Sequence, residues 1–180
     1  SPGNRPVCRL GANYNRLMPS TLAAPSLSSL CATRLIALDA FADRAAVLNY
    51  CHDLARDNMS GYLATRGRTY DSRLWYEHSG TAVFQVIACA GKRVGFVSTW
   101  ANRYSTPSQH IGDLQLEEDS RNLGIGSTVI DAVIDDARSS GCCEVTLNVF
   151  FDNPAAALYR RHGFEQIHFD GDKIRMRKFL

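Results

Sequence analysis

The stretch that decides the fold is Arg121-Asn122-Leu123-Gly124-Ile125-Gly126-Ser127. It lies between a predicted strand, residues 110–117, and a predicted amphipathic helix. Gly124 and Gly126 lack a Cβ, so backbone N–H groups of the turn can approach an anion closely. The following helix directs its free N–H groups and the positive end of its dipole to the same place. With Arg121 as an adjacent cation, the turn is predicted to bind a pyrophosphate.

Two other nucleotide-binding turns do not fit this stretch. A Rossmann turn needs a third glycine where Val129 stands, and it follows a leading βαβ unit that this chain does not show. A P-loop needs Gly-Lys-Ser/Thr, which does not follow here. The pattern that fits is Arg-x-x-Gly-x-Gly between a strand and a helix.

Hydrophobic periodicity on both sides of the turn predicts an α/β (α+β) domain. Asn153 before Pro154 is expected to cap a short helix that ends at Gly163, and Asp170-Gly171 indicates a terminal hairpin. Residues 57–80 are expected to form a short helix with loops. The predicted strands are 34–38, 81–90, 93–100, 110–117, 144–151, 164–169 and 173–179, and the predicted helices are 39–56, 127–140 and 154–162.

These motifs together resemble those of the GNAT superfamily of acyl-CoA-dependent N-acyltransferases. The Arg121-x-x-Gly124-x-Gly126 turn resembles its motif A, and Ala155 to Phe164 resembles its Ala-x-x-x-Tyr-x-x-x-Gly-Phe signature. The resemblance implies a mixed, mostly antiparallel central sheet flanked by helices, with splayed fourth and fifth strands. It covers residues 33–180, and residues 1–32 are expected to be an irregular tail.

The resemblance also implies the position of the co-substrate, acetyl-CoA. Its pantetheine arm is expected between the splayed strands, on the backbone of Leu114, Gln115 and Leu116. Asn153 is expected to contact it from the fifth strand, although a helix cap accounts equally well for this asparagine. The residues expected to hold the pyrophosphate are Arg121, Asn122, Leu123, Gly124, Ile125, Gly126 and Ser127.

Three residues are candidates for the chemistry of acetyl transfer. Tyr159 lies where the family places a tyrosine near the thioester sulfur, and a phenol can donate a proton to the leaving thiolate. His110, at the head of the fourth strand, is the first candidate for the base that deprotonates the amine. Asp113 on the same strand is the second candidate. Asn148 stands where ribosomal-protein acetyltransferases have a glutamate, which disfavours that subfamily.

The predicted function is transfer of acetyl from acetyl-CoA to a primary amine, by direct attack in a ternary complex. The acceptor is expected to be a small molecule, with the aromatic and arginine-rich stretch 62–78 and the loop 100–109 as candidate pocket walls. Two alternatives stay open: an enzyme that acetylates proteins, and an acyl-CoA-binding module without activity.

Composition excludes several other classes of protein. The chain has 180 residues, of which 45% are hydrophobic and 21% charged, with a net charge of +2. No apolar run is long enough for a membrane span, and no basic excess indicates a nucleic-acid partner. The six cysteines lack zinc-site spacing, so no metal is expected. We expect free thiols and hence a cytoplasmic protein, with a homodimer as a possibility implied by the family.

Overall fold

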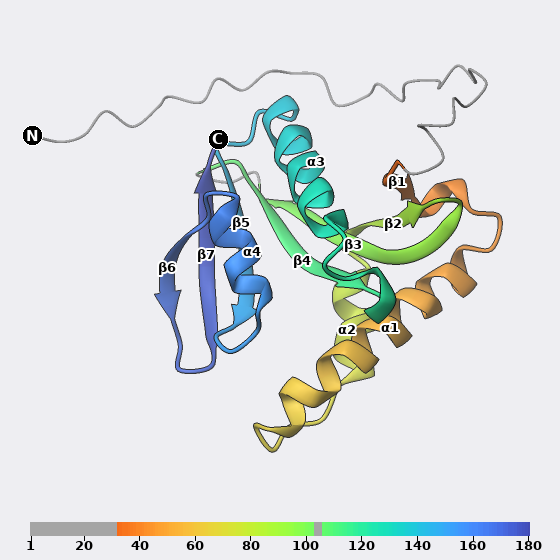
Figure 1. Ribbon diagram of the computed structural model, residues 1–180, viewed down its shortest axis with the longest axis horizontal. Coiled ribbons are helices and arrows are strands. Elements are labelled where there is room, and N and C mark those ends of the chain that lie inside the picture. The colour runs from red at the N-terminus through yellow and green to blue at the C-terminus, as the bar shows by residue number, and fades with distance from the viewer. Residues whose placement is uncertain (1–31, 103–105) are drawn as a thin grey trace, which may run out of the picture.

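The computed structural model describes residues 32–102 and 106–180 of the chain (Figure 1). The predicted tail therefore lies outside the described residues except for its last position. The strands are β1 (Arg34–Ala37), β2 (Val83–Cys89), β3 (Lys92–Asn102), β4 (Ser108–Leu116), β5 (Glu144–Phe150), β6 (Glu165–Phe169) and β7 (Lys173–Phe179). The helices are α1 (Arg44–Ala64), α2 (Ser72–Ser79), α3 (Ile125–Ser139) and α4 (Ala155–Arg161), with 3-10 turns η2 (Leu38–Ala40) and η3 (Glu118–Ser120).

All seven strands join one mixed sheet in the order β1-β2-β3-β4-β5-β7-β6. Each neighbouring pair is antiparallel except β4 and β5, which are parallel. The β4–β5 pairing covers only Ser108–Ile111 and Glu144–Leu147, so beyond Ile111 the two strands separate. The predicted mostly antiparallel sheet with splayed fourth and fifth strands is thus confirmed.

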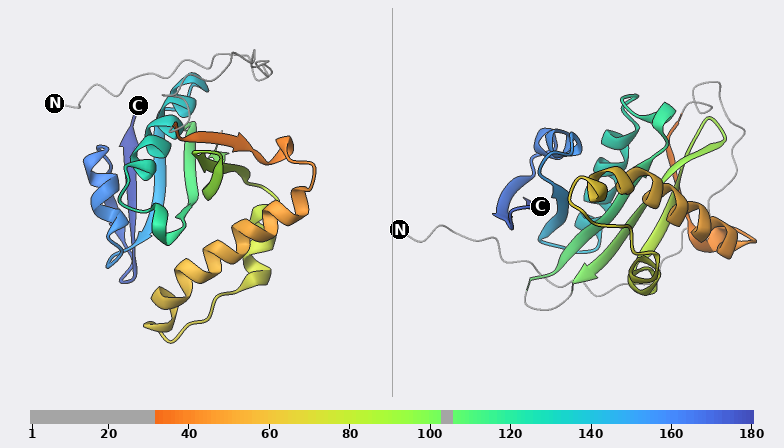
Figure 2. Two further views of the ribbon diagram at one scale, coloured as in Figure 1. Left: turned by 45° about the vertical axis from the view of Figure 1, so that its right-hand side comes forward. Right: turned by 90° about the horizontal axis from the view of Figure 1, so that it is seen from below.

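Helices cover the two faces of this sheet unequally. On one face α3 and α4 pack against β4, β5 and β7 around Ile130, Leu147 and Met176, which are almost fully buried. On the other face α1 packs against β2 and β3 around Cys51 and Phe96. Figures 1 and 2 show α1 and α2 together on the side of β2–β4, away from β6 and most of β7. On the α1/α2 side, the end of α1 reaches β5 at Phe150, whereas no helix of the described residues lies over β7.

The first long helix differs from its predicted range, 39–56. It begins at Arg44 because Asp43 is the residue that caps it, accepting a hydrogen bond from the Ala46 N–H at 2.9 Å. It continues without interruption to Ala64 and so includes residues expected to form loops. Its amphipathic signal is weak, because its buried residues are concentrated in its first half and its second half contacts the edge of a cavity.

The cysteines do not all match the expected free thiols. Cys51 is a buried free thiol in the α1 core. Cys143, just before β5, is disulfide-bonded, so the prediction of a reduced thiol is wrong at this position. Cys8 and Cys31 lie outside the described residues. The prediction of a cytoplasmic location depended on reduced cysteines, and this premise fails at Cys143.

Candidate active site

A cavity of about 420 Å³ lies where β4 and β5 separate. It is lined from both sides of the sheet, because α1 contributes residues from one face and α3 and α4 contribute residues from the other. The lining residues are Asn58, Met59, Tyr62, Leu114, Gln115, Leu116, Arg121, Asn122, Gly124, Gly126, Ser127, Asn153, Pro154, Ala155, Leu158, Tyr159 and Arg161. The cavity thus lies in the gap between the two strands, with α1 on one side of the sheet and α3 and α4 on the other.

The predicted anion-binding turn forms one end of this cavity. Gly124 has a φ of +81°, a left-handed conformation that a side chain would strain, and it is the N-cap of α3. No side chain caps α3, whereas aspartates cap α1 and α2. The first N–H groups of α3 have no partner within the helix and face the turn. An uncapped start of a 15-residue helix beside Arg121 has the chemistry that binds a phosphate.

The edge of β4 forms the wall of the cavity. The Glu117 N–H donates to the Val94 carbonyl on β3 at 2.9 Å. Because backbone groups of successive residues point to opposite sides of a strand, those of Leu114 and Leu116 point away from β3, toward the gap. The Leu116 carbonyl accepts hydrogen bonds from Asn58 Nδ2 at 3.1 Å and Arg121 Nε at 3.3 Å. The open strand edge predicted for the pantetheine arm is therefore present.

The structure brings together most of the residues predicted to bind the co-substrate. Leu114, Gln115, Leu116, Arg121, Asn122, Gly124, Gly126, Ser127 and Asn153 all line the cavity. The side chains of Leu123 and Ile125 do not line it: Leu123 is 69% exposed, and Ile125 is buried in the α3 core. Asn153 also serves as the predicted cap, because its Oδ1 accepts a hydrogen bond from the Ala155 N–H at 2.9 Å.

Sequence reasoning included Tyr62 of α1 only in the candidate acceptor wall, residues 62–78, and missed Asn58 and Met59. Asn58, Met59 and Tyr62 line the cavity, and the Tyr62 ring stacks on Phe150 with centroids 5.8 Å apart. These residues lie in the stretch that was expected to be loops, so no helical face was assigned to them. The continuous helix gives Asn58 and Tyr62 a spacing of i and i+4, which places them on one face.

Tyr159 lies on α4 and lines the cavity from the α3/α4 face. Its side chain is buried and packs edge to face against Phe164. Burial raises the pKa of the phenol above its usual range, and the negative charge of Asp113 raises it further. The hydroxyl is therefore protonated at neutral pH and available as a donor.

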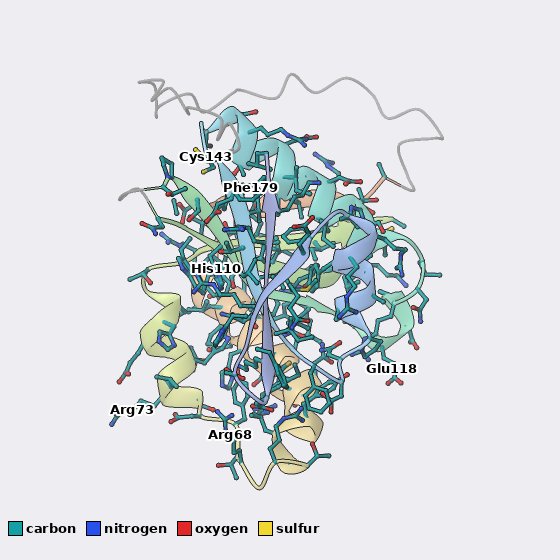
Figure 3. The ribbon with its side chains drawn as sticks, turned by 90° about the vertical axis from the view of Figure 1, so that its left-hand side faces the viewer. Arg68, Arg73, His110, Glu118, Cys143 and Phe179 are labelled. Atoms are coloured by element: carbon teal, nitrogen blue, oxygen red, sulfur yellow. The ribbon has the colours of Figure 1, made fainter. Side chains whose placement is uncertain are left out.

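His110 does not line the cavity but lies on the α1/α2 face, close to the splay. Its Nδ1 is 2.8 Å from Thr146 Oγ1 on β5, and its ring packs against Trp100 with centroids 4.5 Å apart. Burial lowers the pKa of the imidazole to about 4, and the positive charge of Arg175 contributes. His110 is therefore neutral at physiological pH. In Figure 3 it lies on the same side of the sheet as α2.

Asp113 ends a chain of hydrogen bonds that starts at the anion-binding turn. Arg121 donates to Asn58 Oδ1 at 2.6 Å, Asn58 donates to Gln115 Oε1 at 3.0 Å, and Gln115 donates to Asp113 Oδ1 at 3.3 Å. Because arginine can only donate and an ionised carboxylate can only accept, the direction of this chain is fixed. Burial raises the pKa of Asp113, and hydrogen bonds from Gln115 and Ser98 oppose that rise.

An open strand edge between splayed parallel strands, beside an uncapped helix N-terminus, defines the class of transferases that use acyl-CoA. The chain belongs to the acetyltransferase (GNAT) family, whose model matches residues 48–164, and it is an acyltransferase. The family expected from the turn and the Ala155–Phe164 signature is thus confirmed.

Solved structures similar to this chain share its fold. Arabidopsis thaliana NAA60, in complex with a bisubstrate analogue, is 19% identical, with coverage of 83% of this chain and 98% of that one and a TM-score of 0.62. The PaiA N-acetyltransferase from Thermoplasma acidophilum, in complex with coenzyme A, is 16% identical, with 83% and 98% covered and a TM-score of 0.61. A GNAT acetyltransferase from Elizabethkingia anophelis with acetyl-CoA bound is 16% identical, with 61% and 84% covered and a TM-score of 0.52. A comparison with curated proteins gave no match.

Two further features bear on partners. No helix in residues 32–102 and 106–180 is long and apolar enough to cross a membrane. Within those same ranges, no three His, Cys, Asp or Glu side chains are grouped as they would be around a metal ion.

Proposed function

We propose that this protein is an acetyl-CoA-dependent N-acetyltransferase that acetylates a primary amine by direct attack in a ternary complex. The observation that carries the proposal is the cavity at the β4–β5 splay. It brings the open edge of β4, the uncapped start of α3 and the hydroxyl-bearing side chain of Tyr159 to one place. Its lining comes from both faces of the sheet, and we expect the thioester and the amine to approach from opposite sides.

The co-substrate supplies a thioester-activated acetyl group when it is bound. The residues that would hold it are the β4 edge at Leu114–Leu116 and the turn from Arg121 to Ser127. The backbone groups of β4 also provide the donors that stabilise negative charge at a carbonyl oxygen. Arg121 is exposed and held to Asn58 by a hydrogen bond, so it can turn from Asn58 toward a phosphate.

Tyr159 is proposed to protonate the departing thiolate. A thiol has a reference pKa of about 8.5, well below the raised pKa of this buried phenol, so proton transfer to free thiolate is uphill at equilibrium. The role of Tyr159 is therefore to hold its proton against the sulfur as negative charge develops there. Tyr159→Phe removes only that hydroxyl. We expect unchanged acetyl-CoA affinity and a tenfold or greater loss of kcat; full activity in this variant would exclude Tyr159 as the acid.

His110 and Asp113 are proposed to act on the amine from the α1/α2 face. An imidazole with a pKa of about 4 is a weak base and releases a bound proton readily. His110 therefore fits the role of a relay that takes a proton from the amine and transfers it to solvent. Asp113 is the terminal acceptor of the chain of hydrogen bonds from Arg121, and burial raises its pKa, which favours uptake of a proton by this carboxyl. The two groups act from the face opposite Tyr159, as direct attack requires.

For the acceptor we propose a small primary amine, with a protein N-terminus as the second candidate. The second candidate has support from similar structures, since Arabidopsis thaliana Naa50 was solved with the bisubstrate analogue CoA-Ac-MVNAL. On this chain the α1–α2 loop is tied to the β5–α4 loop and to the β6–β7 turn, because Arg66 forms ion pairs with Asp152 and with Asp172. This tie narrows the entrance between these elements, which favours a small acceptor over an extended chain.

The first test is calorimetric titration with acetyl-CoA, free CoA and NADH. Micromolar binding of acetyl-CoA without a response to NADH supports the proposal, and no binding of either CoA form refutes it. A thiol-release assay with a panel of small amines and of short peptides follows. Binding without turnover on any acceptor would favour the acyl-CoA-binding module instead.

A further inference from the structure

The inference concerns the strand β7, which presents a row of cations on the α1/α2 face. Lys173, Arg175 and Arg177 pair across to Phe150, Asn148 and Thr146 on β5. The alternate residues Ile174 and Met176 are buried against α3 and α4, so the three cations point to the opposite face. On this side no helix of the described residues lies over β7 (Figure 2).

Two of these cations have partners within the protein. Lys173 lies 4.9 Å from the Phe150 ring centroid. Arg177 lies over the Phe179 ring at 4.2 Å and is 3.8 Å from the Glu144 carboxylate. Figure 3 shows Phe179 near one end of this strand.

Arg175 differs from them. Among residues 32–102 and 106–180 it has no ion pair, hydrogen bond or ring contact, and it is exposed. By contrast, the nearby Arg66 and Arg68 are both held by Asp172. A guanidinium keeps its charge at any relevant pH and binds a carboxylate with two parallel hydrogen bonds. Arg175 is thus a cation available to a ligand.

Its position connects it to the reacting centre. Arg175 is the cross-strand neighbour of Asn148, the first residue of β5 beyond the paired stretch, at the edge of the splay. His110 pairs with Thr146 on β5, and Arg175 pairs with Asn148, two residues further along β5 on the same face. The charge of Arg175 accordingly acts on His110. Trp100, 39% exposed, packs on His110 and adds an apolar wall. The backbone of Arg175 lies one strand spacing, about 5 Å, from β5 at the edge of the splay, and an arginine side chain is long enough to span that distance.

We propose that Arg175 binds a carboxylate on the acceptor, so that the enzyme prefers amines that carry a carboxylate a few bonds from the nitrogen, as amino acids do. The inference rests on the proposed function and names the class of its acceptor. The amine would enter the splay beside His110 while the carboxylate lies on the Arg175 guanidinium. The β7 row also adds positive charge to this face, which favours an acidic over a polycationic acceptor.

The test compares pairs of amines that differ only in a carboxylate: tyrosine with tyramine, histidine with histamine, and lysine with cadaverine. Wild-type enzyme is expected to show a kcat/KM at least tenfold higher for the amino acid of a pair. Arg175→Gln is expected to reduce that preference about tenfold or more, mainly through KM of the amino acid. Any effect that comes through His110, whose pKa the charge of Arg175 lowers, is common to both members of a pair and cancels in the preference. Arg175→Lys should restore part of it, because the charge is retained without the bidentate geometry.

Lys178→Gln is the matched control, because it removes one charge from the same strand at a position paired with the buried Val145, on the other face. It should leave the preference unchanged. Turnover without any preference for the carboxylate, or an equal effect of Arg175→Gln on both members of a pair, would overturn the inference while leaving the acetyltransferase proposal intact.

Binding is the readout if none of these amines turns over. Calorimetry of tyrosine against the CoA-loaded protein should then show affinity that Arg175→Gln removes and Lys178→Gln keeps. Absence of binding, or binding equal in both variants, overturns the inference. Failure of acetyl-CoA itself to bind is a separate result and refutes the proposed function.

Discussion

The pKa of His110 makes a quantitative prediction about stability. Burial and the charge of Arg175 lower this pKa to about 4, against an unfolded reference near 6.5. Between these two values the unfolded chain binds more protons than the folded chain, so stability increases with pH and falls as the solution is acidified. At pH 5 the unfolded imidazole is almost fully protonated, whereas roughly a tenth of folded molecules carry the proton. Acidification from pH 7 to pH 5 is therefore expected to cost about 2 kcal/mol through this one residue.

The perturbation is His110→Gln, which removes the titrating group and keeps an amide able to bond Thr146. Urea unfolding at pH 7, 6 and 5 gives the free energy of unfolding for each protein. The wild-type loss between pH 7 and pH 5 should exceed that of the variant by about 2 kcal/mol. His78→Gln, which removes an exposed imidazole on α2, should retain the wild-type slope. Equal slopes for wild type and His110→Gln would refute the burial argument, whatever the absolute stabilities are.

Substitutions at two glycines, Gly124 and Gly112, test the site directly. Gly124→Glu is expected to abolish acetyl-CoA binding in calorimetry, because it places a negative charge at the anion-binding turn. Gly124→Ala should retain binding, because its added Cβ meets nothing within 4 Å. This alanine should lower stability only through the strain of its φ of +81°, by about 1–2 kcal/mol. Gly112→Ala should destabilise the protein by about 1–3 kcal/mol in urea unfolding and lower kcat, because its Cβ would lie 2.2 Å from the Trp100 ring, which packs on His110. Wild-type kcat in Gly112→Ala would show that the Trp100–His110 contact has no part in turnover.

Much of the fold could be predicted from the sequence because its signals are local. Three of these signals depend only on neighbouring residues: the alternation in residues 144–151, the cap and the glycine stop of the short helix, and the Gly124–Gly126 turn. Each predicted strand matches an observed strand within about three residues at either end, as expected of boundary assignments. The mostly antiparallel sheet and the β4–β5 splay came only from the family resemblance, because pairing between distant strands leaves little trace in one sequence.

The part of the site formed by α1 could not be predicted. Asn58 has no recognisable motif, and its contact with Leu116 joins residues 58 positions apart. Its role depends on where α1 crosses the sheet, which packing decides. Arg175 was missed for the same reason: its exposure follows from the absence of a helix over β7, and no pattern within the strand records that.

The chain of hydrogen bonds through Asn58 gives the two faces of the sheet a physical connection. Arg121 is the end of the chain that a phosphate would attract, and Asp113 is the end buried on the α1/α2 face. When Arg121 turns to an anion, Asn58 Oδ1 loses its donor, while Asn58 Nδ2 still serves both Gln115 and the Leu116 carbonyl. The amide of Asn58 is then free to reorient, and its hold on Gln115, and through it on Asp113, depends on the co-substrate. We therefore expect binding at the turn to change the position of the Asp113 carboxylate on the α1/α2 face, where the amine is proposed to enter, although no single side chain touches both.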